Sequence, residues 1–422
     1  MSINLQLTTV ILLYCFPTMP APNAVRHLHQ AEKHMRIGIV CYPTYGGSGV
    51  VATELGLALA AKGHQIHFIT YKRPARLTHF RENVYFHEVN TEEYPLFDYT
   101  PYDTTLTSKL VDVVKYEKLD LLHVHYAIPH ATVAYLAKQI LASEGIEIPV
   151  ITTLHGTDIT LVGSDKSFAP VVTFSINNSD GVTAVSEHLK QQTCEQLRIR
   201  KEIEVIYNFI DFSRFSRTNK EHFKMAIAPA GERILMHTSN FRRVKRIDDV
   251  IQTFAKVLEQ LPAKLLLVGD GPERPRLERL CRDMGLYEHV RFLGKQDAIE
   301  EILAVADLFI IPSENESFGL AALEAMACEV PVISSDAGGL PEVNIHGVTG
   351  FLSKIGDVDS MAANALLLLG NQEMLQEFRK NALEQAHRFD ISFILPKYEA
   401  YYEKVLNQFR QAQREREVAG SR

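Results

Sequence analysis

Two glutamates flank a short segment that has the sequence of a helix start. Glu316 and Glu324 stand eight residues apart, and Ser317-Phe318-Gly319-Leu320 lies between them, just after the apolar run Leu308–Ile311. The free N–H groups of a helix start attract anions, and ligands of open parallel sheets bind beyond the carboxyl ends of the strands. If the intervening chain is helical, the two carboxylates lie roughly 12 Å apart. That separation suits a diphosphate ligand with hydroxyl groups on both sides, although the same acids could merely stabilise the helix dipole.

A basic segment follows another apolar run. Four of the five residues in Arg242–Arg246 are cationic, and the segment comes just after Arg233–Thr238. The chain as a whole is acidic, with 44 basic and 51 acidic residues and a formal net charge of −7. Local cations at the carboxyl end of a strand could neutralise a departing diphosphate, and the alternative is a solvated loop.

Glycine-rich loops follow two other apolar runs. Gly269-Asp270-Gly271 comes after Lys264–Val268, where glycine permits close approach of the backbone to a ligand, although a plain turn would use the same residues. Gly46–Gly49 precedes a helix predicted over Val50–Ala61. The N–H groups of this loop and the Ser48 hydroxyl could hold an anion.

The second of these loops also imitates a dinucleotide-binding fingerprint, through Gly47-x-Gly49-x-x-Ala52. A nicotinamide site would need an acidic residue about 20 residues further on, near the end of the second strand. Thr70-Tyr71-Lys72 stands there instead. The sequence therefore disfavours a nicotinamide-dependent oxidoreductase.

Histidines mark the end of two further apolar runs. His155 follows Val150–Leu154 and precedes Gly156, so its ring should point into a cleft at the carboxyl edge of the sheet, although a lone histidine is more often structural. His123 and His125 alternate onto one face of a strand and would suit a metal, but no third ligand of suitable spacing accompanies them. We therefore expect no metal site.

The elements that must position these residues alternate between strands and helices from Met35 onward. This pattern predicts an α/β fold with two doubly wound, Rossmann-like domains that face a cleft. We expect a first domain over residues 35–207, completed by a C-terminal helix over about residues 390–412, and a second domain over residues 208–389. The expected strands are Arg36–Cys41, Gln65–Thr70, Leu119–His125, Val150–Leu154, Gly181–Val185, Ile203–Ile206, Arg233–Thr238, Lys264–Val268, Val290–Leu293, Leu308–Ile311 and Val332–Ser334. The expected helices of the second domain are Ile247–Gln260, Pro275–Met284, Ala298–Val305 and Phe318–Ala327.

Composition excludes several other classes of protein. Fractions of 46% hydrophobic and 23% charged residues are typical of a globular protein, and the negative net charge argues against a nucleic-acid partner. The five cysteines form no Cys-x-x-Cys pair, so we expect neither a disulfide framework nor a structural zinc, and we expect a cytoplasmic location. The apolar run Val10–Phe16 is too short for stable membrane insertion. Residues 1–34 are expected to be a disordered extension or a misassigned start rather than a cleaved signal.

Together these motifs resemble those of the retaining GT-B glycosyltransferases. The resemblance covers residues 35 to about 410 and depends most on Glu316-x7-Glu324 and on Gly338-Gly339-Leu340-Pro341-Glu342. It is closest to a subgroup that transfers N-acetylglucosamine from UDP-N-acetylglucosamine to L-malate in bacillithiol biosynthesis. The segments that carry this closer likeness are Cys41-Tyr42-Pro43, Gly46–Val50, His123–His130, Thr152–Ile159 and Tyr207–Asp211.

The resemblance implies roles for individual residues. Glu316 would contact the hexose of the donor, Glu324 would contact its ribose, and His155 would donate to the sugar. Arg242 and Lys245 would stabilise the leaving diphosphate, so that no metal or other cofactor is required and UDP-N-acetylglucosamine is a co-substrate. The other implied donor contacts are Gly47, Asn240, Gly269, Asp270, Gly271, Phe318, Gly319 and Leu320.

The acceptor is expected to bind to the first domain. A dicarboxylate such as L-malate needs cationic, hydroxyl or N–H partners, and Ser48, Arg76, Tyr126 and Thr153 are the candidates. Two alternatives remain open: a GT-B transferase with a glycolipid or polysaccharide acceptor, and a sugar-nucleotide-binding protein without catalysis. Beyond its small-molecule substrates, a homo-oligomer is the one partner that the sequence leaves open.

Overall fold

The computed structural model describes residues 34–44, 46–90, 101–160, 167–218 and 220–420. The chain divides into two units, Met1–His34 and Met35–Arg422. The extension predicted over residues 1–34 therefore lies outside the described residues, apart from His34. All that follows concerns the second unit.

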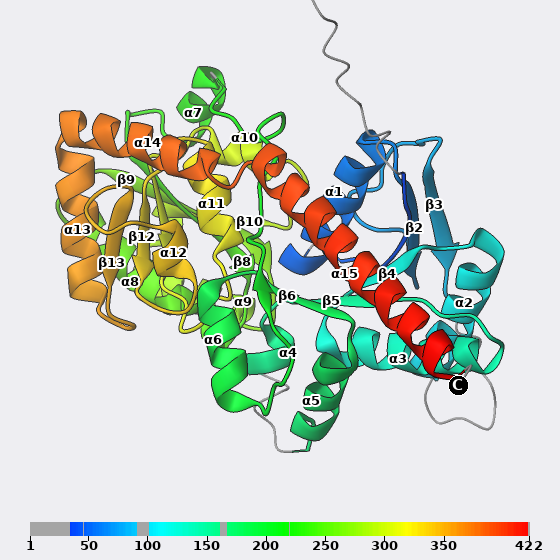
Figure 1. Cartoon of the computed structure of the whole chain (residues 1–422). Helices are drawn as coiled ribbons and strands as arrows, with labels where there is room; N and C mark the ends of the chain where they lie inside the picture. The colour runs from blue at the N-terminus through cyan, green and yellow to red at the C-terminus, as the bar shows by residue number, and fades with distance from the viewer. Residues whose placement is uncertain (1–33, 45, 91–100, 161–166, 219, 421–422) are drawn as a thin grey trace, which may run out of the picture. The chain divides into compact units, whose positions relative to one another are not determined.

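The first half of this unit contains a parallel sheet of seven strands within the described residues (Figure 1). Their spatial order places β1 and β4 next to each other, so the connections run outward in opposite directions from that point. The strands, in that order, are β3 (Val84–Glu88), β2 (Gln65–Thr70), β1 (Arg36–Val40), β4 (Leu121–His125), β5 (Val150–Leu154), β6 (Gly181–Ala184) and β7 (Glu204–Val205). The helices of this half are α1 (Gly47–Ala61), α2 (Tyr102–Glu117), α3 (Thr132–Ser143), α4 (Thr157–Thr160), α5 (Ala169–Asn178) and α6 (Glu187–Gln196), with a π-turn, η1, over Ala127–Ala131.

The second half contains a parallel sheet of six strands in the part of the chain that the structure describes. In spatial order they are β10 (Val290–Gly294), β9 (Ala263–Asp270), β8 (Arg233–Asn240), β11 (Leu308–Ile311), β12 (Val332–Ser335) and β13 (Gly350–Ser353). The helices are α7 (Glu221–Ile227), α8 (Ile247–Leu258), α9 (Arg274–Asp283), α10 (Ile299–Leu303), α11 (Leu320–Ala327), α12 (Leu340–Val343), α13 (Val358–Gly370) and α14 (Gln372–His387), with 3-10 turns η2 (Arg243–Lys245) and η3 (Tyr287–His289). The predicted class, two parallel α/β domains, is confirmed.

Burial explains why these segments become strands. Every residue of β4, β5 and β11 is buried, as expected for strands that helices cover on both faces. The covering helices are one-sided: α8 buries Val250, Ile251, Phe254 and Val257 at helical spacing. Replacing Phe254 with alanine would cost about 3–5 kcal/mol.

Two helix starts differ from the sequence prediction. The helix predicted from Val50 already begins at Gly47, so Ser48 belongs to the first turn of α1 rather than to a loop. The helix predicted from Phe318 begins only at Leu320, because Gly319 adopts a left-handed conformation with φ of 96°. Residues Glu316–Gly319 are consequently not helical, and the spacing of roughly 12 Å expected for a helical Glu316–Glu324 segment does not apply.

The last helix, α15 (Ile391–Gly420), follows the second sheet in sequence but completes the core of the first. It runs across the first sheet in Figure 1 (red) and extends beyond the predicted end near residue 412. Tyr401 Oη accepts a hydrogen bond from Val182 N at 2.8 Å and donates one to Val182 O at 3.0 Å. Tyr402 Oη lies 2.7 Å from Nδ1 of His123 on β4. These contacts anchor the helix to the two strands β4 and β6.

Candidate active site

A lysine and a glutamate meet beyond the carboxyl ends of β8 and β11, which are hydrogen-bonded neighbours. Lys245 Nζ lies 2.5 Å from Glu316 Oε1, and the side chains are only 19% and 15% exposed. Ser313 Oγ donates to the same carboxylate oxygen at 2.9 Å. Two residues predicted for the site are therefore in direct contact, and the glutamate lies where an anionic ligand would compete with it for the lysine.

The remaining cations of the basic segment separate into two kinds. Arg246 binds Glu314 (Nη1–Oε1, 2.9 Å) and Asp249 (Nε–Oδ2, 2.6 Å), so it holds the loop after β11 against α8. Arg242 is exposed, and its side chain has no ion pair with any described residue. Its guanidinium is therefore available to an incoming anion.

Glycines shape the loop that carries Glu316. A Cβ on Gly338, which has φ of 63°, would lie 2.0 Å from Glu316 O, and the N–H of Gly339 donates to that oxygen at 2.7 Å. The loop after β12 is therefore pressed against the loop after β11. Only glycine permits this approach, which fixes the backbone between Glu316 and the start of α11.

A second close approach joins the ends of β8 and β9. Gly269 has φ of 117°, and a Cβ there would lie 1.9 Å from Ser239 O. A Cβ on Gly271 would lie 2.7 Å from Phe241 N. The register pairs Asn240 with Asp270, and both side chains are exposed at the same edge as Lys245. These predicted donor contacts therefore share one edge of the sheet.

Glu324 lies on α11, one turn beyond its start, and is half-buried. Burial raises the pKa of its carboxyl to about 7; Arg214 offsets part of this effect and Glu300 adds to it. The side chain is therefore able to donate or accept a hydrogen bond near neutral pH, as a ribose hydroxyl would require. Phe318 is 2% exposed, so this residue can offer a ligand little beyond its backbone.

The first domain brings a second helix start to the same region. A Cβ on Gly47, the first residue of α1, would lie 3.6 Å from Leu320 Cδ2, at the first residue of α11. Tyr126 Oη donates to Ser48 Oγ at 2.7 Å. The predicted acceptor residues Ser48 and Tyr126 are thus in contact with each other and close to the donor side.

Further contacts join the two domains beside this region. A Cβ on Gly156 would lie 1.6 Å from Ser317 Oγ, and Ser186 Oγ donates to Ser317 O at 2.5 Å. The carboxylate of Glu342 accepts the N–H groups of Glu187 and His188, at the start of α6. The neighbours of His155 and of Glu316 in sequence therefore touch. Neither Ser186 nor Glu342 can be assigned to the site from its neighbours in sequence, because each acts through a partner more than 130 residues away.

His155 is buried, and its Nε2 lies 2.8 Å from Nδ1 of His125. Burial, with a smaller effect of His130, lowers the pKa of His155 to about 3, so the ring is neutral at pH 7. Behind it, Asp158 accepts the N–H groups of Ala127 and Gly156, at 2.8 and 3.0 Å, and orders the turn. His125 and Asp158 are thus positioning residues that the sequence analysis did not identify.

Two other acceptor predictions fare differently. Thr153 is fully buried, and its hydroxyl lies 2.6 Å from both His123 Nε2 and Thr183 Oγ1. It is part of the core beneath Tyr402, with its hydroxyl bound to side chains of the core. Arg76 is half-buried; its Nε lies 3.9 Å from Glu54 Oε1 and has no hydrogen-bond partner among the described residues.

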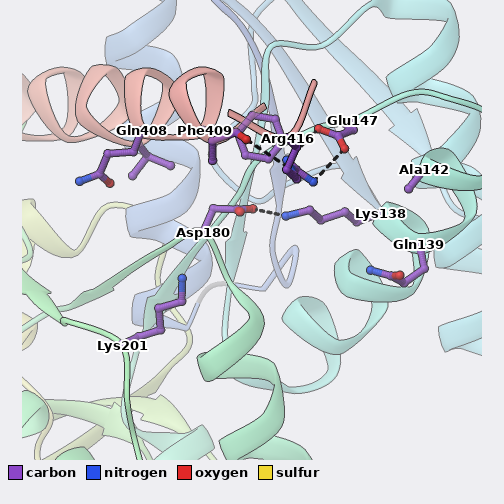
Figure 2. A pocket seen from close by; sticks show the side chains of 11 residues that line it. Lys138, Gln139, Ala142, Glu147, Asp180, Lys201, Gln408, Phe409 and Arg416 are labelled. Carbon is purple, nitrogen blue, oxygen red and sulfur yellow. Dashed lines mark hydrogen bonds and ion pairs between the residues drawn. The ribbon is translucent and has the colours of Figure 1, made fainter. Parts of the chain in front are cut away.

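The sheet edge opposite the site holds a cavity of about 450 Å³ (Figure 2). It lies between α3, the start of β6 and α15, and contains none of the predicted site residues. Its walls are held by the ion pairs Lys138–Asp180 (2.6 Å) and Arg416–Glu147 (3.1 Å). The ammonium of Lys138 and the guanidinium of Arg416 are thus paired, whereas Lys201 lines the cavity without an ion pair to any described residue.

The two sheets, the paired helix starts and the Lys245–Glu316 contact define a GT-B glycosyltransferase. Residues 45–214 match the family model "Glycosyltransferase Family 4", and residues 218–385 match "Glycosyl transferases group 1". The chain is 48% identical, over 88% of its own length and 97% of the relative's, to the N-acetyl-alpha-D-glucosaminyl L-malate synthase of Bacillus anthracis. The chain therefore belongs to the family of glycosyltransferases that these two models and this relative represent.

More distant relatives share the fold. A D-inositol 3-phosphate glycosyltransferase of Thermobispora bispora is 26% identical over 86% of this chain and 90% of the relative. The structure of Anabaena HepE in complex with UDP-glucose covers 89% of this chain and 100% of its own, with a TM-score of 0.75 and 22% identity. The structure of sucrose-phosphate synthase from Thermosynechococcus elongatus has a TM-score of 0.74 and 21% sequence identity, and it also covers 89% of this chain and 100% of its own. Among the described residues, no helix is both long and apolar enough to cross a membrane.

Proposed function

We propose that the chain transfers N-acetylglucosamine from UDP-N-acetylglucosamine to the hydroxyl of L-malate, with retention of the α configuration and release of UDP, in the biosynthesis of bacillithiol. The observation that carries the proposal is the 48% identity to the malate synthase of Bacillus anthracis over 97% of that protein. The contacts at the candidate site supply the groups that this reaction needs.

The donor would bind to the second domain. Its diphosphate would accept hydrogen bonds from the N–H groups at the start of α11 and would displace Glu316 from the Lys245 ammonium. Arg242 would add a second cation. Freed from the lysine, the Glu316 carboxylate would bind hydroxyls of the sugar, while Glu324 would bind the ribose. The two cations and the N–H groups would supply the counter-charge without a metal or other cofactor.

The acceptor would bind to the first domain, beside the start of α1. Ser48 and Tyr126 offer hydroxyl groups there. The Nε–H of Arg76 donates no hydrogen bond to any described residue. A malate carboxylate could accept it and would then compete with Glu54 for this cation.

The reaction would proceed on one face of the sugar. The malate hydroxyl oxygen forms a bond to the anomeric carbon, the bond from that carbon to the diphosphate oxygen breaks, and the hydroxyl proton passes to the departing phosphate. Lys245 and Arg242 stabilise the charge on that phosphate. The His155 imidazole, which is neutral, orients the sugar. Closure of the cleft would exclude water, which would otherwise hydrolyse the donor.

The test is a product assay. The protein is incubated with UDP-N-acetylglucosamine and L-malate, UDP release is followed, and the product is identified by its mass and by the NMR coupling of its anomeric proton. Succinate, which has both carboxylates of malate but no hydroxyl, is the matched control and should give no product. UDP release with a glycolipid or a polysaccharide but not with malate would instead favour the alternative acceptors. Binding of UDP without turnover on any acceptor would favour a sugar-nucleotide-binding protein.

A further inference from the structure

Away from the candidate active site, two histidines and a glutamate come together at the edge of the first sheet. His67 lies on β2 and His87 on the edge strand β3, and His67 Nδ1 is 2.9 Å from His87 Nε2. Glu117, the last residue of α2, completes a group whose ligand atoms all lie within 4.8 Å of one another. Three separate elements contribute these side chains, so the fold itself creates the cluster.

The two histidines share one face of the sheet. The register pairs His67 with Tyr85, and His87 lies two residues further along β3, so all three side chains point to the same side. The Tyr85 ring stacks on His67 with 4.7 Å between centroids. His67 is 1% exposed, whereas His87 and Glu117 are half-buried and accessible from the sheet edge.

One buried nitrogen in this cluster lacks a hydrogen-bond partner in the part of the chain that the structure describes. Nε2 of His67 makes no hydrogen bond with any described residue. Leaving such an atom unsatisfied costs about 1–3 kcal/mol, so its presence calls for an explanation. Among the described residues, the His67 ring has one hydrogen-bond contact, with His87, and stacks on Tyr85, so a ligand between the three side chains would replace only the His87 contact.

We propose that His67, His87 and Glu117 bind one divalent transition-metal ion, with zinc preferred. Two imidazole nitrogens and one carboxylate oxygen, with water as the fourth ligand, match the donor set of open tetrahedral zinc sites. Bonds of about 2.0–2.1 Å place two ligand nitrogens roughly 3.3 Å apart. The present His67–His87 contact therefore needs to open by only a few tenths of an ångström.

Charges around the cluster agree with a metal site of moderate affinity. Burial lowers the pKa of His67 to about 4 and also lowers that of His87, so both rings are neutral, as ligands must be. Arg36 lowers the pKa of His67 further, and Lys109 does the same for His87. Glu117 raises the pKa of His87 and so opposes the effect of burial there. Glu117 is thus the anion that compensates a cation here.

Metal binding would fasten the edge strand to the end of α2. Among the described strands, β3 pairs only with β2, and α2 follows β3 in sequence. An ion held by His87 and Glu117 would link β3 directly to α2. This role is separate from the proposed transfer reaction, and neither substrate is needed to observe it.

The test measures zinc retention by the full chain without a histidine tag. After treatment with a chelator and then with zinc, gel filtration and elemental analysis should find about one equivalent of zinc per chain in the wild type. His87→Gln and Glu117→Gln should each weaken binding by about tenfold or more. His79→Gln changes an exposed histidine outside the cluster and should bind like the wild type.

Two further measurements keep the test decisive if a variant folds poorly. Cobalt in place of zinc should give the visible absorption of a tetrahedral site in the wild type, and zinc should raise the Tm of the wild type but not that of Glu117→Gln. Absence of the cobalt spectrum from the wild type, or equal zinc retention by the wild type and a folded His87→Gln, would overturn the proposal. So would a loss of zinc in His79→Gln equal to the loss in His87→Gln.

Discussion

Replacing Lys245 with methionine is the sharpest perturbation of the candidate active site. Methionine keeps much of the side-chain length but removes the ammonium that lies 2.5 Å from Glu316 Oε1. If Lys245 stabilises the departing phosphate, its loss costs about 3 kcal/mol of transition-state energy, or roughly a 150-fold fall in kcat. The variant should also be less stable by about 1–3 kcal/mol, because the mostly buried Glu316 carboxylate loses its cation.

A second variant separates these two effects. Lys245→Met/Glu316→Gln removes the unpaired carboxylate, so its Tm should return toward that of the wild type while kcat stays low. Lys256→Met is the matched control, because Lys256 lies in the same domain and pairs at 2.9 Å with the exposed Asp359. Initial rates of UDP release at saturating substrates give kcat, and calorimetry gives Tm. A fall in kcat of less than about tenfold in Lys245→Met, or full recovery of kcat in the double variant, would refute the role assigned to Lys245.

Three other predictions follow. Gly338→Ala should lower kcat/KM for the sugar nucleotide by about tenfold or more, because its Cβ would meet Glu316 O at 2.0 Å. Gly347→Ala is the control: this glycine also has a positive φ, but no atom lies within 4 Å of its added Cβ, so kcat/KM should stay unchanged. Burial raises the pKa of Glu324 to about 7, so the folded state favours the protonated carboxyl, and the Tm of the wild type should fall relative to that of Glu324→Gln as pH rises from about 5 to 8. A Tm difference that stays constant with pH would contradict that assignment. Tyr402→Phe deprives a buried histidine of its hydrogen-bond partner and should lower the free energy of unfolding by about 1 kcal/mol, measured in urea; an unchanged midpoint would count against the contact.

The central strands could be predicted from sequence, and the sheet edges could not. The predicted bounds of β2, β5 and β11 agree with the structure, because each is a short run rich in apolar and β-branched residues that becomes almost fully buried. β3 was not predicted, since it is a half-exposed edge strand that contains Tyr85, His87 and Glu88. β13 was missed because only four residues form it and glycine begins it.

The candidate site could be predicted residue by residue but not as a set of contacts. Lys245 and Glu316 were each assigned to the site, yet their pairing spans 71 residues and depends on the alignment of β8 with β11. The burial of Thr153 could not be predicted from its neighbours in sequence, because Tyr402, which contacts His123 beside it, lies about 250 residues further along the chain. The start of α11 was placed too early because the left-handed conformation of Gly319 is set by the fold around it.

The position of α15 has a consequence for how the polypeptide acquires its structure during synthesis. The 30 residues of this helix leave the ribosome after every described strand of both sheets, yet Tyr398 and Tyr402 within it are buried against the sheet that is made earlier of the two. The half of the molecule that is translated first is therefore the last to become complete. A nascent chain that stops at the end of α14 would contain every described strand of both sheets. The apolar face of the first sheet that α15 covers would still be exposed.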